Sequence, residues 1–261
     1  MTDSPVRTRC DGAIFEVTLD RPRANAIDAP TSRRLGEAFA QFRDDPALRV
    51  AIVTGAGEKF FCAGWDLVAA ADGEPQDADY GVGGFGGLQE LPDLNKPVIA
   101  AVNGMAVGGG FELALAADLI IAAAHARFAL PEINAGTLAE AATVRLPRRI
   151  PYHLAMELLL LGRWMSAAEA QQRGILSAVV PAAELMEQAR ALARTLAQGP
   201  PLVFAAIKEV VRDGERLAFG AAMQAIRTRR FPTVARLYAS EDQREGARAF
   251  RDKRAPAWQG R

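Results

Sequence analysis

The sequence predicts an α/β protein in which short buried strands alternate with helices around one core. Half of the 261 residues are hydrophobic and only 7% are aromatic. This composition, with alanine frequent in the second half of the chain, favours helices that pack closely through small side chains over an aromatic-rich β-sandwich. Apolar, β-favouring runs also alternate with helical patterns, which is typical of stacked strand and helix units.

Six apolar runs predict strands, and they cover residues 14–19, 50–53, 98–102, 119–121, 128–130 and 178–180. The first helix is expected to begin between Pro30 and Ser32 and to end at Arg43. It ends there because Pro46 cannot continue a helix and restricts the residue before it. Later helices are predicted at residues 111–117, 152–161, 167–173 and 185–197.

The Gly199-Pro200-Pro201 step is the best internal boundary of the chain. Beyond it, residues 202–250 look helical, amphipathic and charged, like an appendage that packs on the core or on another subunit. We therefore divide the chain into a core, residues 1–199, and a C-terminal helical region, residues 200–261. The glycine-rich stretch 72–87 is either a disordered connector or a mobile flap over a ligand.

The overall charge argues against partners that bind through bulk electrostatics. Lys+Arg and Asp+Glu both number 31, so no net field attracts nucleic acid or an anionic membrane. Cys10 and Cys62 lack metal-ligand spacing, which indicates free thiols in a reducing compartment. No apolar run approaches the roughly 18 residues that cross a bilayer, and the N-terminus lacks a signal-peptide pattern. We expect a soluble, cytoplasmic protein without a metal site.

Two glycine-bearing turns follow predicted strands. Residues 58–67 come after the strand that ends near Thr54, and such a turn can point backbone N–H groups at a ligand oxygen, although a purely structural turn explains it equally well. Gly108, Gly109 and Gly110 lead into a helix, where they cost stability. This pattern indicates a backbone that approaches something closely, with N–H groups aimed at negative charge. A dinucleotide-binding loop fits poorly, because the spacing is not Gly-x-Gly-x-x-Gly.

Two carboxylates lie close to these turns in unexpectedly apolar surroundings. Glu112 sits just inside the helix after the three glycines, in a run so apolar that it should be largely buried. A buried carboxylate is costly unless it is paired or functional, so we favour a functional role over a satisfied structural glutamate. The same reasoning applies more weakly to Glu132, which follows an apolar strand and a proline.

Taken together, these segments resemble the crotonase, or enoyl-CoA hydratase, superfamily nearly from end to end. Residues 19–27 look like its CoA-contacting loop, and residues 61–67 and 97–110 like its two oxyanion-hole loops. The resemblance implies a crotonase-type spiral of stacked ββα units with a C-terminal helical region. It also implies an enzyme that adds or removes water across the 2,3 bond of a CoA thioester.

Within the superfamily, the resemblance is closest to the carnitinyl-CoA dehydratase, or crotonobetainyl-CoA hydratase, branch. It rests on residues 20–29, 57–61, 64–67 and 253–258. Ordinary hydratases usually carry a smaller residue at the position of Trp65. The alternative within the superfamily is a general enoyl-CoA hydratase or isomerase that acts on fatty-acyl or amino-acid-derived thioesters.

The resemblance implies that Glu112 and Glu132 are the catalytic pair. The backbone N–H groups of Trp65 and Gly109 would form an oxyanion hole for the enolate that develops on the thioester. Two carboxylates near one water repel each other, so one is expected to stay protonated. Relatives with a single acidic position isomerise double bonds, so the presence of both glutamates favours hydration.

Further roles follow from the same resemblance. Arg21 and Arg23 would lie near the CoA phosphates, and the rest of the CoA path would be lined by Ala24, Ala26, Ala63, Gly64, Asp66 and Leu67. Gly108 and Glu140 would border the acyl pocket. No metal or redox cofactor is implied, because coenzyme A enters as part of the substrate. The family commonly forms trimers or dimers of trimers, so a homotrimer or homohexamer is expected.

Two other functions found among relatives fit this sequence less well. Dehalogenase-type relatives rely on a histidine and an aspartate that are absent here, and His125 and His153 are expected at the surface. A non-catalytic relative that binds RNA or acyl-CoA is the alternative from another class. The balanced charge argues against RNA, and the presence of both glutamates argues against lost catalysis.

The chain departs from the family pattern after Glu132. The family usually shows a proline- and glycine-rich turn, whereas residues 136–145 form a stretch that is one residue shorter and contains Glu140. One hypothesis is that Glu140 and Trp65 hold a cationic acyl tail such as a trimethylammonium group. The alternative is an ion pair between Glu140 and Arg145 on a helix surface.

Overall fold

Two sheets organise the fold in the computed structural model, which describes residues 4–261. The larger sheet has the order β1 (Val6–Asp11), β2 (Ile14–Leu19), β3 (Val50–Gly55), β5 (Val98–Val102), β7 (Leu119–Ala123) and β10 (Ala178–Val180). The β1–β2 pair is antiparallel and every other pair in this sheet is parallel. The smaller sheet has the order β4 (Phe60–Cys62), β6 (Met105–Val107), β8 (Arg127–Ala129) and β9 (Met165–Ser166).

The chain winds through both sheets in repeated ββα turns. The units are β3–β4–α2 (Leu67–Ala71), β5–β6–α3 (Gly109–Ala116) and β7–β8–α4 (Glu132–Ala135). Each unit places one strand in each sheet, and successive strands pair in parallel. This arrangement is the predicted spiral. It brings the turns that follow β4, β6 and β8 to one end of the smaller sheet.

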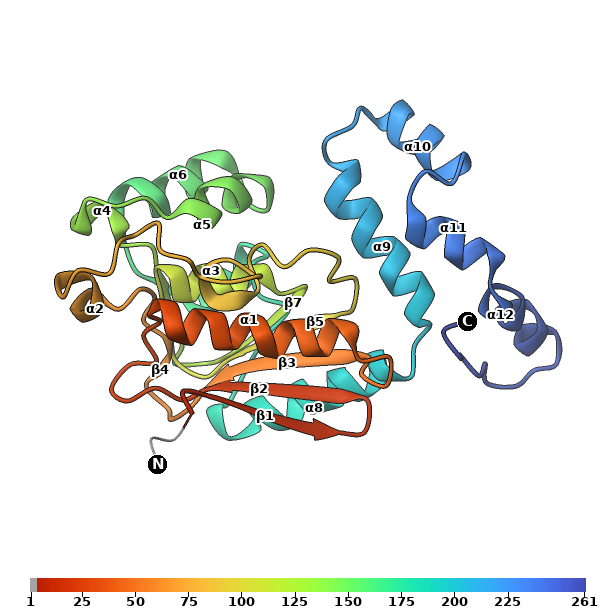
Figure 1. Cartoon of the computed structure of the whole chain (residues 1–261), viewed down its shortest axis with the longest axis horizontal. Helices are drawn as coiled ribbons and strands as arrows, with labels where there is room; N and C mark the ends of the chain where they lie inside the picture. The colour runs from red at the N-terminus through yellow and green to blue at the C-terminus, as the bar shows by residue number, and fades with distance from the viewer. Residues whose placement is uncertain (1–3) are drawn as a thin grey trace.

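Helices cover both faces of the larger sheet, as Figure 1 shows for α1 (Ala29–Asp44) and α8 (Leu185–Ala197). Alternate residues of β3 face opposite clusters: Val53 packs with the α1 side, whereas Ile52 packs with the α8 side. Every residue of β3 is therefore buried, as expected for a parallel strand that is covered on both faces. The Asp28 side chain caps α1 by accepting the Thr31 N–H.

The C-terminal region consists of α9 (Pro201–Gly214), α10 (Phe219–Arg227), α11 (Pro232–Ala239) and α12 (Glu241–Arg251). In Figure 1 these helices lie beside the sheets and have little of the core around them. Residues of α9, α10 and α11 form a small apolar cluster of their own, together with Phe231. Lys208 attaches α9 to the sheets, because its Nζ donates to Lys96 O and Asp118 Oδ2, each at 2.7 Å.

All six predicted strands are present, with small shifts of their ends. The predicted helices are also present, among them α6 (Tyr152–Leu161) and α7 (Ala167–Gln172), as is the helical character of residues 202–250. The short helix α5 (Glu140–Arg145) lies between α4 and α6. The prediction missed β1, β4, β6 and β9. Three of these are only two or three residues long, too short for a periodic pattern. The fourth, β1, is an edge strand that exposes all but one residue.

The cysteines and histidines lie as the sequence predicts. Cys10 and Cys62 are free thiols, and His125 and His153 are exposed. Across residues 4–261, no helix combines the length and apolar character that a membrane span requires. In the same range, no cluster of three or more histidine, cysteine or acidic side chains is arranged to hold a metal ion.

The glycine end of the stretch 72–87 is packed against α1. Ser32 Oγ donates to Gly84 O at 3.0 Å and accepts the Gly86 N–H at 2.9 Å. Gly86 and Gly87 are buried within the short helix η1 (Phe85–Gly87). At this end, the disordered-connector interpretation is therefore wrong.

Candidate active site

A cavity of about 340 Å³ lies where the turns of the spiral meet. Its walls include Trp65, Gly109, Glu112, Glu132 and Glu140. Parts of the stretch 76–85 also line it. The fold thus brings both candidate catalytic carboxylates and both residues of the candidate oxyanion hole to one cavity.

Glu112 is held in the first turns of α3 and is only 7% exposed. Its Oε1 accepts the backbone N–H of Ala142 in α5 at 2.8 Å. Burial raises the pKa of Glu112, while the Ala142 N–H and the positive charge of Arg145 act against that rise. The carboxylate form of Glu112 therefore has a hydrogen-bond donor and a nearby cation to stabilise it.

Glu132 begins α4 and has a different environment. Its Oε2 is buried and lacks a hydrogen-bond partner among residues 4–261. Burial raises the pKa of Glu132 to about 7, and the charge of Glu112 acts in the same direction. A neutral carboxylic acid suits this environment better than a carboxylate does, because burying an unpaired charge is costly.

The Trp65 loop, residues 61–67, runs beside residue 27. A parallel bridge joins Ile27 to Trp65: the Ile27 N–H donates to Gly64 O at 2.7 Å, and the Asp66 N–H donates to Ile27 O at 2.9 Å. The bridge uses the amides of residues 27 and 66. It therefore leaves the Trp65 N–H on the opposite side of the chain.

The glycine loop, residues 107–110, contacts the Trp65 loop backbone to backbone. A Cβ on Gly64 would lie 2.9 Å from the Gly109 nitrogen, and a Cβ on Gly110 would lie 2.1 Å from Cys62 O. A Cβ on Gly109 would lie 2.3 Å from the ring of Phe85. The predicted close approach is confirmed, and its partners are the Trp65 loop and Phe85. As the first residue of α3, Gly109 has an N–H without an intrahelical acceptor.

The candidate CoA-contacting residues come from two neighbouring segments. The Ala63 N–H donates to Ala24 O at 3.1 Å, so residues 24–27 and the Trp65 loop lie side by side. Arg23 is exposed and Leu67 is 61% exposed. Arg21 differs, because its guanidinium is bound within the protein by Asp28, Asp66 and the carbonyl of Ala26.

Asp66 caps α2 and binds Arg21. Burial alone would raise the pKa of Asp66, but hydrogen bonds from Arg21 and from the Val68 and Ala69 amides outweigh it. The pKa of Asp66 therefore lies below its ordinary value, and the side chain is ionised at neutral pH.

The predicted alternative for Glu140, an ion pair with Arg145, is wrong. Arg145 donates instead to Gln89, to Oε1 at 2.8 Å and to the backbone carbonyl at 2.7 Å. Arg145, Gln89 and Glu112 line one hollow next to the cavity. Glu140 is exposed and borders the cavity itself. Gly108 lies against Glu132, since a Cβ there would be 2.6 Å from Glu132 Oε1.

Several wall residues were not singled out by sequence, namely Asp77, Asp79, Tyr80, Phe85 and Glu90. Most lie in the stretch 72–87, so the interpretation of that stretch as a flap is the one signal that pointed to them. Glu74 was also missed. It accepts the Trp65 indole N–H at 3.0 Å.

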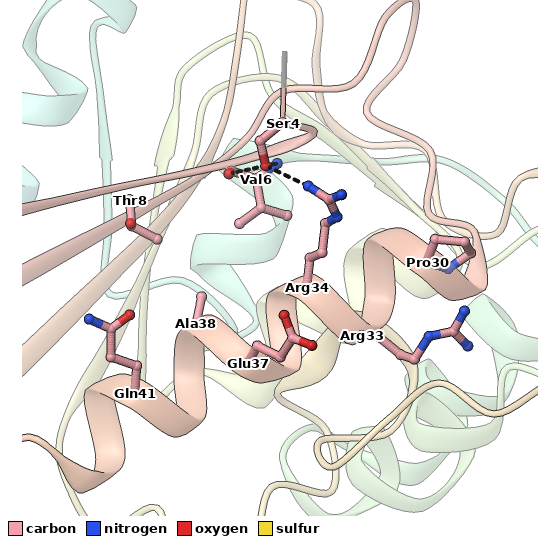
Figure 2. A pocket seen from close by; sticks show the side chains of 9 residues that line it. All are labelled: Ser4, Val6, Thr8, Pro30, Arg33, Arg34, Glu37, Ala38 and Gln41. Atoms are coloured by element: carbon pink, nitrogen blue, oxygen red, sulfur yellow. Dashed lines mark hydrogen bonds between the residues drawn. The ribbon is translucent and has the colours of Figure 1, made fainter. Parts of the chain in front are cut away.

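A larger hollow of about 520 Å³ between β1 and α1 has no relation to these residues. Figure 2 shows it lined by Ser4, Arg33, Arg34 and Glu37 among others, with Arg34 donating to Ser4 Oγ at 3.2 Å. None of the predicted site residues lines it, and it is widely open to solvent.

Comparison with known proteins agrees with this geometry. The profile of a family described as enoyl-CoA hydratase/isomerase matches residues 9–261. The carnitinyl-CoA dehydratase of Proteus mirabilis is 55% identical over 251 residues, which is 96% of each chain. That of Salmonella typhi is 54% identical over 265 residues and 100% of each chain.

Solved structures give the same picture. An enoyl-CoA hydratase from Mycobacterium tuberculosis superposes with a TM-score of 0.89 at 36% identity, over 99% of this chain and 100% of that chain. One from Geobacillus kaustophilus superposes with a TM-score of 0.88 at 39% identity, over 98% of each chain.

Proposed function

Because this chain belongs to the enoyl-CoA hydratase/isomerase family, we propose that it adds water to, or removes water from, the 2,3 bond of a CoA thioester, most specifically in carnitinyl-CoA and crotonobetainyl-CoA. One observation carries the proposal: a single cavity is bordered by Glu112, Glu132 and the two residues, Trp65 and Gly109, whose backbone N–H groups we assign to an oxyanion hole. The near-full-length identity to carnitinyl-CoA dehydratases supports the choice of thioester.

The oxyanion is the first chemical requirement of this reaction. When water adds to the β carbon of an enoyl thioester, negative charge develops on the thioester oxygen. We assign the N–H groups of Trp65 and Gly109 to that oxygen. Fixed N–H donors at such a position lower the barrier by about 3–4 kcal/mol each. The N-terminal end of α3 adds favourable partial charge at the same point.

The two glutamates divide the proton transfers. Glu112 takes one proton from water as the oxygen forms its bond to the β carbon, because its carboxylate is supported by the Ala142 N–H. Glu132 donates a proton to the α carbon, because its pKa of about 7 keeps a substantial fraction of it protonated at neutral pH. The net change is one water added. The proton then passes from Glu112 to Glu132, directly or through solvent, and dehydration follows the same steps in reverse.

The cavity walls support a cationic acyl tail. Four further carboxylates border the cavity, namely Asp77, Asp79, Glu90 and Glu140, together with the aromatic rings of Trp65, Tyr80 and Phe85. Of the described residues that line it, none is a lysine, arginine or histidine. A trimethylammonium group would be attracted by this charge and by the faces of the rings. A saturated fatty-acyl tail would gain nothing from the carboxylates.

The tail assignment has its own test. Glu140→Gln removes one negative charge without changing size. We expect KM for crotonobetainyl-CoA to rise about threefold to tenfold, with KM for the uncharged crotonyl-CoA unchanged, since one partly solvated charge contributes roughly 1 kcal/mol. An unchanged KM for crotonobetainyl-CoA would remove Glu140 from the tail site.

The CoA moiety is assigned to the neighbouring surface. We propose that exposed Arg23 meets a phosphate of CoA, and that Ala24, Ala26 and residues 63–67 line the path of the adenine and pantetheine. The adjacency of the two segments through the Ala63–Ala24 hydrogen bond supports this path. Arg21 is less suited to a phosphate, because its donors have internal acceptors.

We further propose a cytoplasmic homotrimer or homohexamer in which residues 200–261 act as a separate packing region. Large apolar side chains are exposed on these helices, including Phe219 at 82% and Phe250 at 88%, and a subunit contact would cover them. Light scattering of the purified chain measures the assembly, and a monomer would contradict the proposal.

The principal experiment measures hydration of crotonyl-CoA and crotonobetainyl-CoA by wild type, Glu112→Gln and Glu132→Gln, from the loss of the conjugated-thioester absorbance. We expect wild type to be active and each variant to lose roughly a hundredfold or more in kcat while CoA still binds. A wild type that is active on crotonyl-CoA alone would favour a general enoyl-CoA hydratase. A variant with wild-type kcat would contradict the two-carboxylate mechanism.

A further inference from the structure

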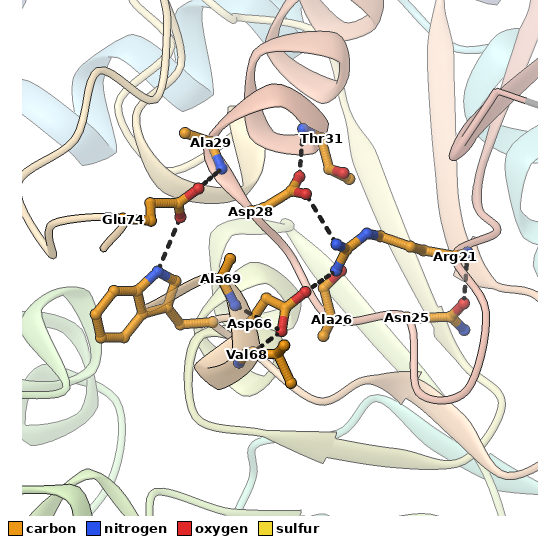
Figure 3. A network of polar contacts seen from close by, with 12 residues as sticks. Arg21, Asn25, Ala26, Asp28, Ala29, Thr31, Asp66, Val68, Ala69 and Glu74 are labelled. Carbon is orange, nitrogen blue, oxygen red and sulfur yellow. Dashed lines mark hydrogen bonds and ion pairs between the residues drawn. The ribbon is translucent and has the colours of Figure 1, made fainter. Parts of the chain in front are cut away.

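The Trp65 loop is attached to the start of α1 by charged side chains to which the proposed chemistry gives no role. Arg21 lies between two carboxylates (Figure 3): Nη2 donates to Asp28 Oδ2 at 2.8 Å and Nη1 to Asp66 Oδ2 at 2.5 Å. Nη1 also donates to Ala26 O at 3.0 Å. The Arg21 side chain is only 25% exposed. Its guanidinium thus has three internal acceptors.

Each of these two carboxylates also caps a helix. Asp28 Oδ1 accepts the Thr31 N–H at 2.8 Å in the first turn of α1, and Asp66 Oδ1 accepts the Val68 N–H at 2.9 Å in the first turn of α2. Arg21 therefore joins the starts of two helices. Trp65 immediately precedes one of these caps, so the position of its backbone depends on the join.

Glu74 makes a second attachment from the other side of the loop. Its Oε1 accepts the indole N–H of Trp65 at 3.0 Å, and its Oε2 accepts the N–H of Ala29 at 3.0 Å. Ala29 is the first residue of α1. Both the backbone after Trp65 and the side chain of Trp65 are thereby fixed to the same helix start.

We propose that Arg21 and Glu74 are positioning residues that hold the Trp65 backbone N–H toward the thioester oxygen. The inference rests on the proposed function, because it concerns the oxyanion hole of that reaction. Rotation of residues 64–66 about the bridge to Ile27 would turn this N–H away from the cavity. A misplacement of about 1 Å can cost on the order of a hundredfold in rate, so such attachments affect kcat without touching the substrate.

The test uses the full chain and two conservative variants, Glu74→Gln and Arg21→Lys. Lysine keeps the charge but lacks the planar fork that joins two carboxylates. Three quantities are measured: kcat for crotonyl-CoA hydration, Kd for CoA, and the infrared carbonyl band of bound butyryl-CoA labelled with ¹³C at the thioester carbon. Butyryl-CoA cannot be hydrated, and hydrogen bonds to its oxygen lower the frequency of that band.

We expect each variant to lose about tenfold or more in kcat and part of the carbonyl shift, with Kd for CoA within about twofold of wild type. The matched control is Arg194→Gln, which breaks an exposed ion pair with Glu187 on α8 and should change none of the three quantities. If Arg21→Lys fails to fold, Glu74→Gln decides the proposal alone.

A double-mutant cycle separates positioning from general stability. Trp65→Phe keeps the backbone amide and an aromatic ring but removes the indole N–H. If Glu74 acts through the indole, Glu74→Gln costs less kcat in the Trp65→Phe background than in wild type. Fully additive losses would overturn the role of Glu74.

A different pattern of results would contradict the positioning role of Arg21. A tenfold weaker Kd for CoA with unchanged kcat and carbonyl band would overturn positioning and make Arg21 a phosphate ligand. Failure of the proposed function would give a result that differs from both of these. If wild type hydrates neither thioester, the proposed reaction fails, while the carbonyl band of bound butyryl-CoA still reports whether Arg21 and Glu74 orient the Trp65 amide.

Discussion

The Trp65 loop and the glycine loop meet at one cavity but are held in place by different forces. The first loop is fixed by hydrogen bonds that Arg21 donates to Asp66 and that Glu74 accepts from the Trp65 indole, and these groups are partly accessible to water. Close contacts fix the second, with no room for a Cβ on Gly109 beside the Phe85 ring or on Gly110 beside the Cys62 carbonyl. The Trp65 loop can therefore be loosened in steps, by charge or by conservative substitution. In the glycine loop, an added Cβ on Gly110 would meet backbone, whereas on Gly108 or Gly109 it would meet the side chain of Glu132 or Phe85.

The largest effect is expected from Gly110→Ala in the glycine loop. The new Cβ would lie 2.1 Å from Cys62 O, and a backbone carbonyl cannot rotate away as a side chain can. We expect about a hundredfold loss of kcat and a free energy of unfolding lower by about 1–3 kcal/mol. Crotonyl-CoA hydration measures kcat, and urea unfolding measures the free energy of unfolding. The control is Gly220→Ala in α10, where the added Cβ would have no atom within 4 Å. Its free energy of unfolding should rise by about 0.4–1 kcal/mol.

A smaller loss is expected from Gly108→Ala, which tests contact with a side chain in place of backbone. Its Cβ would lie 2.6 Å from Glu132 Oε1, at a residue with φ of 53°. The Glu132 side chain can move away from the new Cβ, which would displace the proposed acid. We therefore expect about a tenfold loss of kcat. Gly174→Ala shares the positive φ but has no atom within 4 Å, so it should be strained without losing kcat. Equal kcat values for the two variants would contradict the contact.

Asp66→Asn tests the ionic attachment of the Trp65 loop. Asparagine still caps α2 but cannot pair with Arg21. Because the pKa of folded Asp66 is lowered, its stabilisation is present above the ordinary carboxyl pKa and is lost as pH falls through the lowered value. We expect the variant to be less stable than wild type by roughly 1–2 kcal/mol at neutral pH, and by less in acid. Asp213→Asn, from an exposed pair with Arg212, should have no effect. A deficit that does not change with pH would contradict the ionic origin.

The smallest effect on stability, of opposite sign, is expected from Glu132→Gln beside the glycine loop. The folded pKa of Glu132 is raised to about 7, so wild type is fully stabilised below about 4.5 and loses that stability as pH rises through 7. Glutamine cannot ionise. The melting temperature of the variant relative to wild type should therefore rise by a few degrees between about pH 5 and about pH 8. A relative melting temperature that falls over this range would show that Glu132 is stabilised as a carboxylate.

The same pKa predicts the pH dependence of catalysis. Protonated Glu132 is needed for hydration, so kcat should decline as pH rises through about 7. The pH profile of kcat for crotonyl-CoA measures this, and a profile that rises through that range would reverse the assignment of acid and base.

The fold was predictable where a pattern was long enough to be periodic. The strands at residues 14–19, 98–102 and 178–180 and the helices at 152–161 and 185–197 have the bounds that the sequence predicts. Although the three-residue strands β8 and β10 were predicted from their apolar runs, the short strands β4, β6 and β9 of the smaller sheet were missed. They form because each turn of the spiral brings a short segment against the previous one, which is a non-local cause.

The features of the site divide in the same way, into local ones that were predictable and non-local ones that were not. The burial of Glu112 and the close approach at the three glycines were predictable, because an apolar helix and the absence of a Cβ are local properties. The partner of Arg145 was not. A charge three to five residues away looks like a helix-surface pair in sequence, whereas the acceptors at Gln89 come from a distant segment.

The sequence by itself determined the α/β class and the family, and the family resemblance in turn implied the ββα order and the two glutamates that we propose move protons. Only the tertiary structure decided which carboxylate is supported as an anion and which lies without a partner, because that depends on the Ala142 N–H and on burial by several distant segments. It also decided that Arg21 binds Asp28 and Asp66 within the protein. An arginine in a loop carries the same five donors whatever it meets, and only the folded chain brings acceptors within hydrogen-bonding distance.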